Sequence, residues 1–420
     1  MMIEIPYDGG IIIANVPKKN ILDVIEPVGT KSLGKSLGLK ESLSSPIGSV
    51  SFDEFVSSAK DLLVIVNDAQ RPICTPAVLE MIEEKIKDKP KKYLVATGSH
   101  KPPTETELSA IFGKFYPSIK EDIYIHRSKA DDEMVFLGVT SNGTPVRLNR
   151  LLFEYDKIIT ITSVEPHNFA GYTGGRKSIV PGISSYETIE RNHWLALKKG
   201  AENLIIDGNP VSEDMYEALT FISDKEIYSI QAVLDKDKKV YKAFGGNIEK
   251  ALYAAARAAD EIYSVPVNEK ADIIVAVPFS PLDASLYQAH KAIENAKPIL
   301  KEGGILILVA SCREGIGPDN FYRLLSQFDD PDKMIERFEK EYKLGEHKSA
   351  KIARLQKWAQ IWTVSEMKPE ILEPIRFRPF SSLERALEEA FLQKGRDDAS
   401  ITFLLDGGIT VPRLRAPERR

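Results

Sequence analysis

The chain has 420 residues, of which 43% are hydrophobic and 28% are charged. That length exceeds what one hydrophobic core usually supports, so two domains are expected. The formal net charge of −5 gives no electrostatic reason to bind nucleic acid or an anionic membrane, and a small-molecule site is the better expectation.

The first residues, MMIEIPYDGG, lack the basic region and apolar run of a secretion signal, and no apolar run reaches the length of a membrane span. The two cysteines, Cys74 and Cys312, are too far apart to argue a disulfide framework or a cysteine-built metal centre. We therefore expect a soluble protein of the reducing cytoplasm with no membrane partner, for which an oligomer is possible.

Short runs rich in β-branched residues predict strands. They are LLVIV at 62–66, YLVAT at 93–97, IITIT at 158–162, IIVAV at 273–277 and ILILVA at 305–310. Segments with helical spacing of apolar residues lie between them, among them PAVLEMIEEKIKDK and TETELSAIFGKF. This alternation predicts an α/β fold with largely parallel sheets.

A long amphipathic stretch, NIEKALYAAARAADEIYS at 247–264, precedes the predicted strand at 273. We place the domain boundary between the two. The prediction is an N-terminal α/β domain of residues 1–268 and a C-terminal α/β domain of residues 269–420, whose last segment is a candidate for return to the first domain.

Polar motifs follow four of the predicted strands. Asp68 and Arg71 follow the first, Ser99 and His100 the second, Glu165 and His167 the third, and Tyr287, Gln288 and Lys291 lie a few residues beyond the fourth. In open α/β sheets, ligands bind outside the carboxyl ends of the strands. We therefore expect one active-site cleft between the two domains.

The segment GYTGGRKS at 171–178 invites comparison with the Walker A loop, but Arg176 stands where the second required glycine belongs. Gly174 and Gly175 let backbone N–H groups approach an anion, and Arg176 adds positive charge. For this motif taken alone, a phosphate cradle and a glycine-rich turn with surface basic residues both remain open.

Three histidines fall at predicted rim positions: His100 after the TGS turn, His167 at a strand end, and His193 in a helix that begins near SSYETIER. Imidazole binds nickel, zinc or iron, and it acts as an acid or base near neutral pH. Among the other histidines, His126 in IYIHRSK is interpreted as a surface residue at a strand end.

Other side chains are candidates for binding. Arg71 in DAQRP suits bidentate capture of a carboxylate or phosphate. Gln288 and Lys291 in YQAHK share one face of a predicted helix. Trp358 and Trp362 are also predicted on one helical face, with Trp362 in the core and Trp358 as a candidate wall of a ligand pocket.

Together these motifs resemble those of the nickel-pincer lactate racemases and their relatives. The resemblance is carried by DAQRP, ATGSHKP, EPHNFAGYTGGRKSIVPG, RNH and YQAHK over residues 68–291, and more weakly by LGEHK and SITFLLDGG. Its spacing is specific, because Lys177 comes ten residues after His167 and His193 comes sixteen residues after Lys177.

The resemblance implies an isomerase that racemises or epimerises a 2-hydroxy acid, lactate-like or larger, by proton-coupled hydride transfer. It implies a nickel-pincer nucleotide cofactor, nickel pyridinium-3,5-bisthiocarboxylic acid mononucleotide. By the same resemblance Lys177 anchors the cofactor, His193 binds nickel, and His100 and His167 are paired bases, one for each enantiomer.

The remaining site residues are assigned on the same ground. Asp68, Gly174, Gly175 and Arg176 are expected to contact the cofactor, Arg71, Gln288 and Lys291 the substrate carboxylate, and Tyr287 and Trp358 the apolar side of the substrate. Gln70 and Lys101 stand where threonine and arginine are common in lactate-type members. Nickel chemistry is therefore better supported than lactate as the substrate.

Two other functions remain open on the sequence. A zinc-dependent hydrolase or lyase would use His100, His167 and His193 as ligands, but it leaves Lys177 and the glycine-rich loop unexplained. A catalytically silent nucleotide-binding protein would keep the phosphate cradle, and the histidine pair argues against it.

Overall fold

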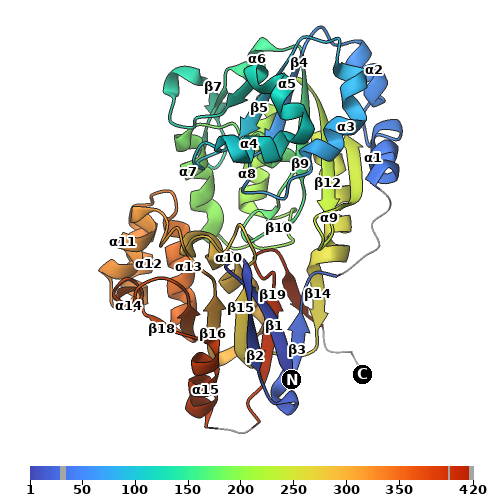
Figure 1. Ribbon diagram of the computed structural model, residues 1–420. Helices are drawn as coiled ribbons and strands as arrows, with labels where there is room; N and C mark the ends of the chain where they lie inside the picture. The colour runs from blue at the N-terminus through green and yellow to red at the C-terminus, as the bar shows by residue number, and fades with distance from the viewer. Residues whose placement is uncertain (29–34, 396–397, 416–420) are drawn as a thin grey trace, which may run out of the picture. The chain divides into compact units, whose positions relative to one another are not determined.

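The computed structural model describes residues 1–28, 35–395 and 398–415. The chain divides into two compact units, each built on one six-stranded sheet (Figure 1). Unit 2 is Val28–Ile262, and unit 1 combines Met1–Pro27 with Tyr263–Arg420. The predicted α/β fold class with largely parallel sheets is confirmed.

The sheet of unit 2 has the strand order β13-β12-β9-β4-β5-β6. Its strands are β4 (Leu62–Asn67), β5 (Lys91–Ala96), β6 (Ile123–Ile125), β9 (Lys157–Ser163), β12 (Glu226–Leu234) and β13 (Val240–Gly246). Only the β12/β13 pair is antiparallel among these neighbours. The predicted strands at 62–66, 93–97 and 158–162 are β4, β5 and β9.

Helices cover both faces of this sheet. They are α1 (Lys35–Ser44), α2 (Phe52–Ser57), α3 (Thr75–Ile86), α4 (Glu105–Phe112), α5 (Tyr116–Ile119), α6 (Leu151–Glu154), α7 (Tyr186–Trp194), α8 (Pro210–Thr220) and α9 (Ile248–Tyr263). Val64 of β4 packs in the core with α3, and the next residue, Ile65, packs in the core with α8. Because both faces are buried, the strand reads as an uninterrupted apolar run rather than an alternating one.

Two short antiparallel ladders complete unit 2. One joins β7 (Met134–Val139) to β8 (Pro145–Asn149), and the other joins β10 (Pro166–His167) to β11 (Gly171–Tyr172). The β10/β11 ladder pairs His167 with Gly171, so the chain between them makes a tight loop. This loop follows the carboxyl end of β9.

The sheet of unit 1 has the order β18-β17-β16-β15-β19-β3, and all its neighbouring strands are parallel. Its strands are β3 (Ile21–Ile25), β15 (Ala271–Val277), β16 (Leu300–Val309), β17 (Gln360–Val364), β18 (Phe377–Phe380) and β19 (Ile401–Leu405). The predicted strands at 273–277 and 305–310 are β15 and β16. A separate parallel pair joins β14 (Ser264–Val267) to β20 (Val411–Leu414).

The helices of unit 1 are α10 (Leu286–Ala296), α11 (Asp319–Gln327), α12 (Pro331–Lys340), α13 (Glu346–Gln356), α14 (Pro369–Leu372) and α15 (Leu383–Lys394). One face of the sheet packs against α15 and against the antiparallel hairpin of β1 (Met2–Tyr7) and β2 (Gly10–Asn15). Ile3 and Ile5 of this hairpin are buried beside Ile273 and Val275 of β15. Burial of one such side chain contributes about 1.5–3 kcal/mol, so the hairpin is part of this core.

The predicted domain composition is corrected by these contacts. The boundary expected at 268/269 lies close to the observed transition at 262/263, but the first 27 residues belong to unit 1 and not to the N-terminal domain. Strand β3 pairs with β19, starting at Ile21 opposite Ile401. The last segment, including β20, also stays in unit 1, so the suggested return to the first domain is wrong.

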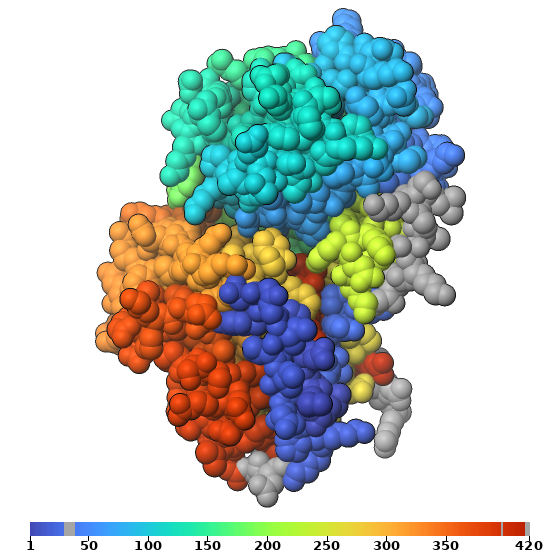
Figure 2. All heavy atoms as spheres, viewed as in Figure 1, coloured from blue at the N-terminus to red at the C-terminus, as the bar shows by residue number. Residues whose placement is uncertain are grey.

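The outer face of hairpin β1/β2 mixes apolar residues with Glu4 and Asn15. Met2, Ile11 and Ile13 are exposed on it, and Figure 2 shows this first part of the chain, in dark blue, at the surface. Among the residues that the structure describes, no helix combines the length and apolar character needed to cross a membrane.

Candidate active site

The loops after β4 and β5 bring an acid–base pair together. Asp68 is 4% exposed, and its Oδ2 lies 2.6 Å from Nδ1 of His100, whose side chain is about one third exposed. The other carboxylate oxygen accepts a hydrogen bond from the backbone N–H of Gln70. Both oxygens of Asp68 therefore have partners inside the protein, and its expected contact with the cofactor stays a prediction.

This contact fixes the chemistry of the imidazole. A carboxylate accepts hydrogen bonds and does not donate them, so Nδ1 of His100 carries the ring proton. The neutral ring then presents Nε2 as an unprotonated nitrogen that can accept a proton. Asp68 thus orients the imidazole of His100.

We expect Asp68→Asn to lower kcat about a hundredfold or more and to change KM little. An amide nitrogen facing Nδ1 would favour the tautomer with its proton on Nε2, which is the wrong one for a base. The matched control is Asp156→Asn, because Asp156 also accepts a backbone hydrogen bond, from Lys60, but lies before β9 at the other edge of the sheet. Steady-state kinetics of both variants check this, and an unchanged kcat in Asp68→Asn would contradict it.

Arg71 lies in the same turn as Asp68 and faces a carboxylate that the sequence reasoning left without a role. Its Nη1 is 3.9 Å from Oε1 of Glu165, whose side chain is 3% exposed. Glu165 follows β9, so the pair joins the loops after two neighbouring strands. The guanidinium expected to bind a substrate carboxylate is thereby held at the carboxyl edge of the sheet.

Three of the residues that were selected by their spacing in the sequence pack around one aromatic ring. Phe169 lies in the tight loop after β10, and its ring makes edge-on contacts with the imidazoles of His167, at 4.5 Å between centroids, and His193, at 5.0 Å. The Nζ atom of Lys177 is 6.0 Å from the centre of the same ring. The structure therefore brings His167, Lys177 and His193 together around Phe169, which the sequence reasoning missed.

Each of these three residues is held in place by hydrogen bonds or burial in its own segment of the chain. His193 is in the last turn of α7, the predicted helix, which Ser185 caps by accepting a hydrogen bond from the Thr188 N–H. His167 accepts a hydrogen bond at Nδ1 from the Ala170 N–H. Lys177 is 7% exposed in the short 3₁₀ turn Gly175–Ser178. In the sequence, Phe169 is marked only as an apolar residue between His167 and the GGRK motif. Nothing else in the sequence indicates that its ring contacts all three residues.

Arg176 is completely buried. The interpretation of this loop as a glycine-rich turn with surface basic residues expects an exposed side chain here. Nη2 of Arg176 donates to the carbonyl of Ala170, and its guanidinium lies over the ring of Tyr216 from α8. Nε and Nη1 have no hydrogen-bond acceptor in the described protein. Burial lowers the pKa of Arg176 from its ordinary high value. A buried cation with two unused donors fits a site for negative charge.

The two glycines before Arg176 are required by packing. Both have positive φ, 79° at Gly174 and 49° at Gly175. A Cβ atom at Gly174 would lie 2.5 Å from the side chain of Val164, and one at Gly175 would lie 2.9 Å from the carbonyl of Ile248. Close packing explains both glycines, and a contact of their N–H groups with an anion stays a prediction.

In unit 1, the predicted residues Tyr287, Gln288 and Lys291 lie on the first turns of α10, and each is partly exposed. Tyr287 packs edge-on against Phe321, with ring centroids 5.4 Å apart. Lys348 of α13 donates to the Tyr287 carbonyl at 2.6 Å and places its ammonium 3.5 Å from the centre of the ring. Lys348 was not predicted as part of any site.

The expected position of Trp358 is wrong. Helix α13 ends at Gln356, so Trp358 lies in the turn before β17 and not on a helical face shared with Trp362. Its carbonyl accepts a hydrogen bond from Gly303 near the beginning of β16. This is the amino edge of the parallel sheet, whereas Tyr287 follows its carboxyl edge. Trp362 is buried, as predicted for a core residue.

The interpretation of His126 as a surface residue is also wrong. It is 1% exposed, and its ring nitrogens are hydrogen-bonded to the Ser184 carbonyl, at 2.9 Å, and to the Asn149 side chain, at 3.2 Å. Burial lowers the pKa of His126 to about 4. His126 therefore joins β6 to the start of α7 as a neutral ring.

This burial predicts a loss of stability in acid. In the unfolded chain a histidine binds its proton near pH 6.5, whereas His126 in the folded protein does so only near pH 4. The unfolded state therefore binds more protons between these values, and stability falls as the pH drops through them. We expect His126 to contribute about 2 kcal/mol less at pH 5 than at pH 7.5. Urea unfolding at both pH values should show a smaller difference for His126→Gln than for the wild type.

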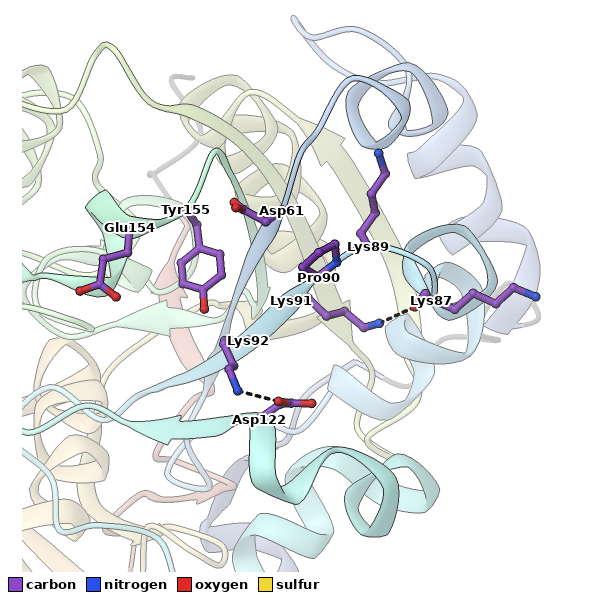
Figure 3. Close-up of a pocket in the computed structure, with 9 residues that line it drawn as sticks. All are labelled: Asp61, Lys87, Lys89, Pro90, Lys91, Lys92, Asp122, Glu154 and Tyr155. Atoms are coloured by element: carbon purple, nitrogen blue, oxygen red, sulfur yellow. Dashed lines mark hydrogen bonds and ion pairs between the residues drawn. The ribbon is translucent and has the colours of Figure 1, made fainter.

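Figure 3 shows an open pocket of about 660 Å³ in unit 2, lined by several lysines. It lies where β4 and β5 begin, at the edge of the sheet opposite His100. Lys91 donates to the carbonyls of Ile86 and Lys87 at the carboxyl end of α3, and Lys92 pairs with Asp122 at 2.7 Å. Lys91 thus complements the negative end of α3, and the pocket is not assigned to the active site.

Within the described ranges, no group of three or more His, Cys, Asp or Glu side chains is placed to share one ion.

Comparisons with known proteins agree on one family. The family model described as the lactate racemase N-terminal domain matches residues 7–204, and the one described as the lactate racemase C-terminal domain matches residues 267–411. A lactate racemase from Lactiplantibacillus plantarum is 32% identical, with the alignment covering 97% of this chain and 99% of that protein. A lactate racemase from Thermoanaerobacterium thermosaccharolyticum is 29% identical over 98% of this chain and 99% of that protein.

Solved structures give the same result. The lactate racemase apoprotein from Thermoanaerobacterium thermosaccharolyticum has a TM-score of 0.89 at 27% identity, covering 98% of this chain and all of that chain. A protein from Thermotoga maritima has a TM-score of 0.73 at 17% identity, over 90% of this chain and 97% of that one, and shows the fold alone. The chain therefore belongs to the lactate racemase family, and it is an isomerase.

Proposed function

We propose that this protein racemises or epimerises a 2-hydroxy acid, lactate or a larger one, with a nickel-pincer nucleotide as its cofactor. The observation that supports the proposal most is the convergence of His167, Lys177 and His193 on the ring of Phe169. These are the residues whose spacing carries the resemblance to the nickel-pincer enzymes.

The residues of unit 2 fit such a group. An imidazole such as that of His193 is a good nickel ligand, and Lys177 offers a primary amine close by. The buried guanidinium of Arg176, with two nitrogens that lack a protein acceptor, suits a cofactor that carries a phosphate. In this assignment Lys177 anchors the cofactor, His193 binds nickel, and Arg176 with the loop at Gly174 and Gly175 faces its negative charge.

When bound, the cofactor supplies a reversible hydride acceptor, which no side chain of the chain can replace. The side chains supply binding and proton transfer. Arg71 binds the substrate carboxylate, and an imidazole removes the proton of the 2-hydroxyl group as the α-hydrogen leaves. The planar 2-oxo acid that results can be reduced on either face, which is how the configuration is inverted.

Two bases serve the two configurations in this proposal. Nε2 of His100, oriented by Asp68, takes the hydroxyl proton from one enantiomer, and His167 takes it from the other. Each returns the proton when the reaction runs in the opposite direction. In unit 1, Gln288 and Lys291 are proposed to bind the substrate carboxylate, and Tyr287 to contact the apolar part of the substrate.

The test is racemisation by protein made in cells that synthesise the cofactor. A panel of single enantiomers of 2-hydroxy acids, including lactate, is incubated with the protein, and the loss of optical activity is followed. Nickel analysis and the mass of the intact protein are measured on the same sample. Zinc in place of nickel with no added cofactor mass, or no racemisation in a nickel-loaded sample, would overturn the proposal.

A further inference from the structure

We propose that Glu165 sets how tightly this enzyme holds the carboxylate of its substrate, by sharing the charge of Arg71. The inference rests on the proposed function, which gives Arg71 the substrate carboxylate, and it adds a residue that neither the motif spacing nor the proposed mechanism uses.

Glu165 is a buried carboxylate with few partners. It is 2% exposed, and its backbone is fixed by two hydrogen bonds of 2.9 Å with Thr173, one in each direction. Its Oε2 accepts no hydrogen bond from the described protein. A buried carboxylate with an unused oxygen is costly unless a positive charge compensates it. Arg71 is the cation placed to do so.

The contact between the two is an ion pair and not a hydrogen bond. At 3.9 Å, Nη1 of Arg71 and Oε1 of Glu165 are beyond hydrogen-bonding distance. In the part of the chain that the structure describes, the guanidinium of Arg71 donates no hydrogen bond, and its side chain is 19% exposed. Its N–H groups are therefore available for a carboxylate ligand, which arginine binds in a bidentate manner.

The neighbouring thiol adds no charge to this pair. Cys74 is also close to Glu165, and burial raises the pKa of its thiol to about 12. It is neutral at physiological pH, so the pair consists of one cation and one anion.

A substrate carboxylate on Arg71 would place a second anion on the same guanidinium. Two like charges several ångströms apart repel each other, more strongly in a buried site than in water. Glu165 thus weakens the binding of the substrate while it holds Arg71 in place. For a reversible reaction that releases both configurations, this favours exchange of the ligand.

The test is Glu165→Gln in the holoenzyme, because glutamine keeps the size of the side chain and removes its charge. We expect KM for the 2-hydroxy acid to fall about tenfold, the size expected for removing one like charge several ångströms away, with a smaller change in kcat. KM for the uncharged amide of the same acid should not fall, because it has no carboxylate to repel.

The matched control is Glu226→Gln. Glu226 forms an ion pair with Lys157 at 2.8 Å in the same unit, at the start of β12 and β9, away from Arg71. Its KM should equal that of the wild type. Circular dichroism shows whether each variant is folded, and if Glu165→Gln is not, Glu165→Asp, which moves the charge away from Arg71, should lower KM in the same direction.

An unchanged or higher KM for the acid in the folded variant, or an equal change for the acid and its amide, would overturn the inference and leave Glu165 a structural role. Absence of racemisation in the wild type would instead reject the proposed function. In that case, calorimetric titration with the same 2-hydroxy acid still decides the inference, because a tighter Kd in Glu165→Gln supports it and an equal Kd rejects it.

Discussion

Replacing His100 or His167 by alanine is expected to lower racemisation by about a hundred- to ten-thousandfold, the usual effect of losing an acid–base group. The two variants should also treat the enantiomers differently. Both configurations must lose a hydroxyl proton, and when both present the α-hydrogen to the same hydride acceptor, their hydroxyl groups point to different sides of the site. If each histidine serves one side, each variant keeps its reaction with one enantiomer.

Single-turnover experiments measure this directly. Each variant is mixed with each pure enantiomer, and the 2-oxo acid formed in the first turnover is quantified after quenching. His100→Ala should form it from one enantiomer and His167→Ala from the other. Equal impairment of both enantiomers in both variants would reject the assignment of two bases, and equal impairment in one variant would leave that histidine a role in orientation.

Replacing His193 by alanine is expected to abolish the retention of nickel during purification. The reason is that His193 is the proposed protein ligand of the metal, and the alanine side chain has no atom that can bind it. The protein should remain folded, since the side chain of His193 is partly exposed and its ring packs edge-on against Phe169. Metal analysis gives the nickel content per chain, and circular dichroism gives the fold. Stoichiometric nickel in the variant would show that the ligand lies elsewhere.

Trp194→Phe is the matched control, because Trp194 is the next residue of the same helical turn. Its ring contacts Arg191 and Lys198, and its replacement removes no nickel donor. This variant should keep its nickel. For Lys177→Ala, the measurement is the intact mass of the denatured protein. If Lys177 holds the cofactor covalently, the denatured wild type keeps the cofactor mass and the variant loses it. If only His193 and Arg176 hold the cofactor, its mass is absent from the denatured wild type as well.

The strands were predictable from the sequence because their signal is local. Buried parallel strands such as β4 and β15 are continuous β-branched runs, and helices between them show their own periodicity. The membership of residues 1–27 was not predictable in this way. It depends on the pairing of Ile21 with Ile401, and no local pattern indicates a partner so distant in the chain.

The site shows the same division between local and distant information. The spacing of His167, Lys177 and His193 selected residues that contact one ring. The partners of the site residues came only from the fold, since Asp68 meets His100 and Arg71 meets Glu165 across loops of different strands. Trp358 was misplaced because a three-residue gap between tryptophans fits a helix as well as a turn followed by a strand.

The discontinuous composition of unit 1 has a consequence for how the chain is made on the ribosome. Strand β3 is synthesised among the first segments, but β19, which it pairs with, is synthesised among the last. All six strands of the other sheet lie in between, in one uninterrupted stretch. During translation, the unit that carries His100, His167, His193, Lys177 and Arg71 can complete its sheet first, while the apolar faces of the hairpin and β3 stay uncovered until β19 has been made.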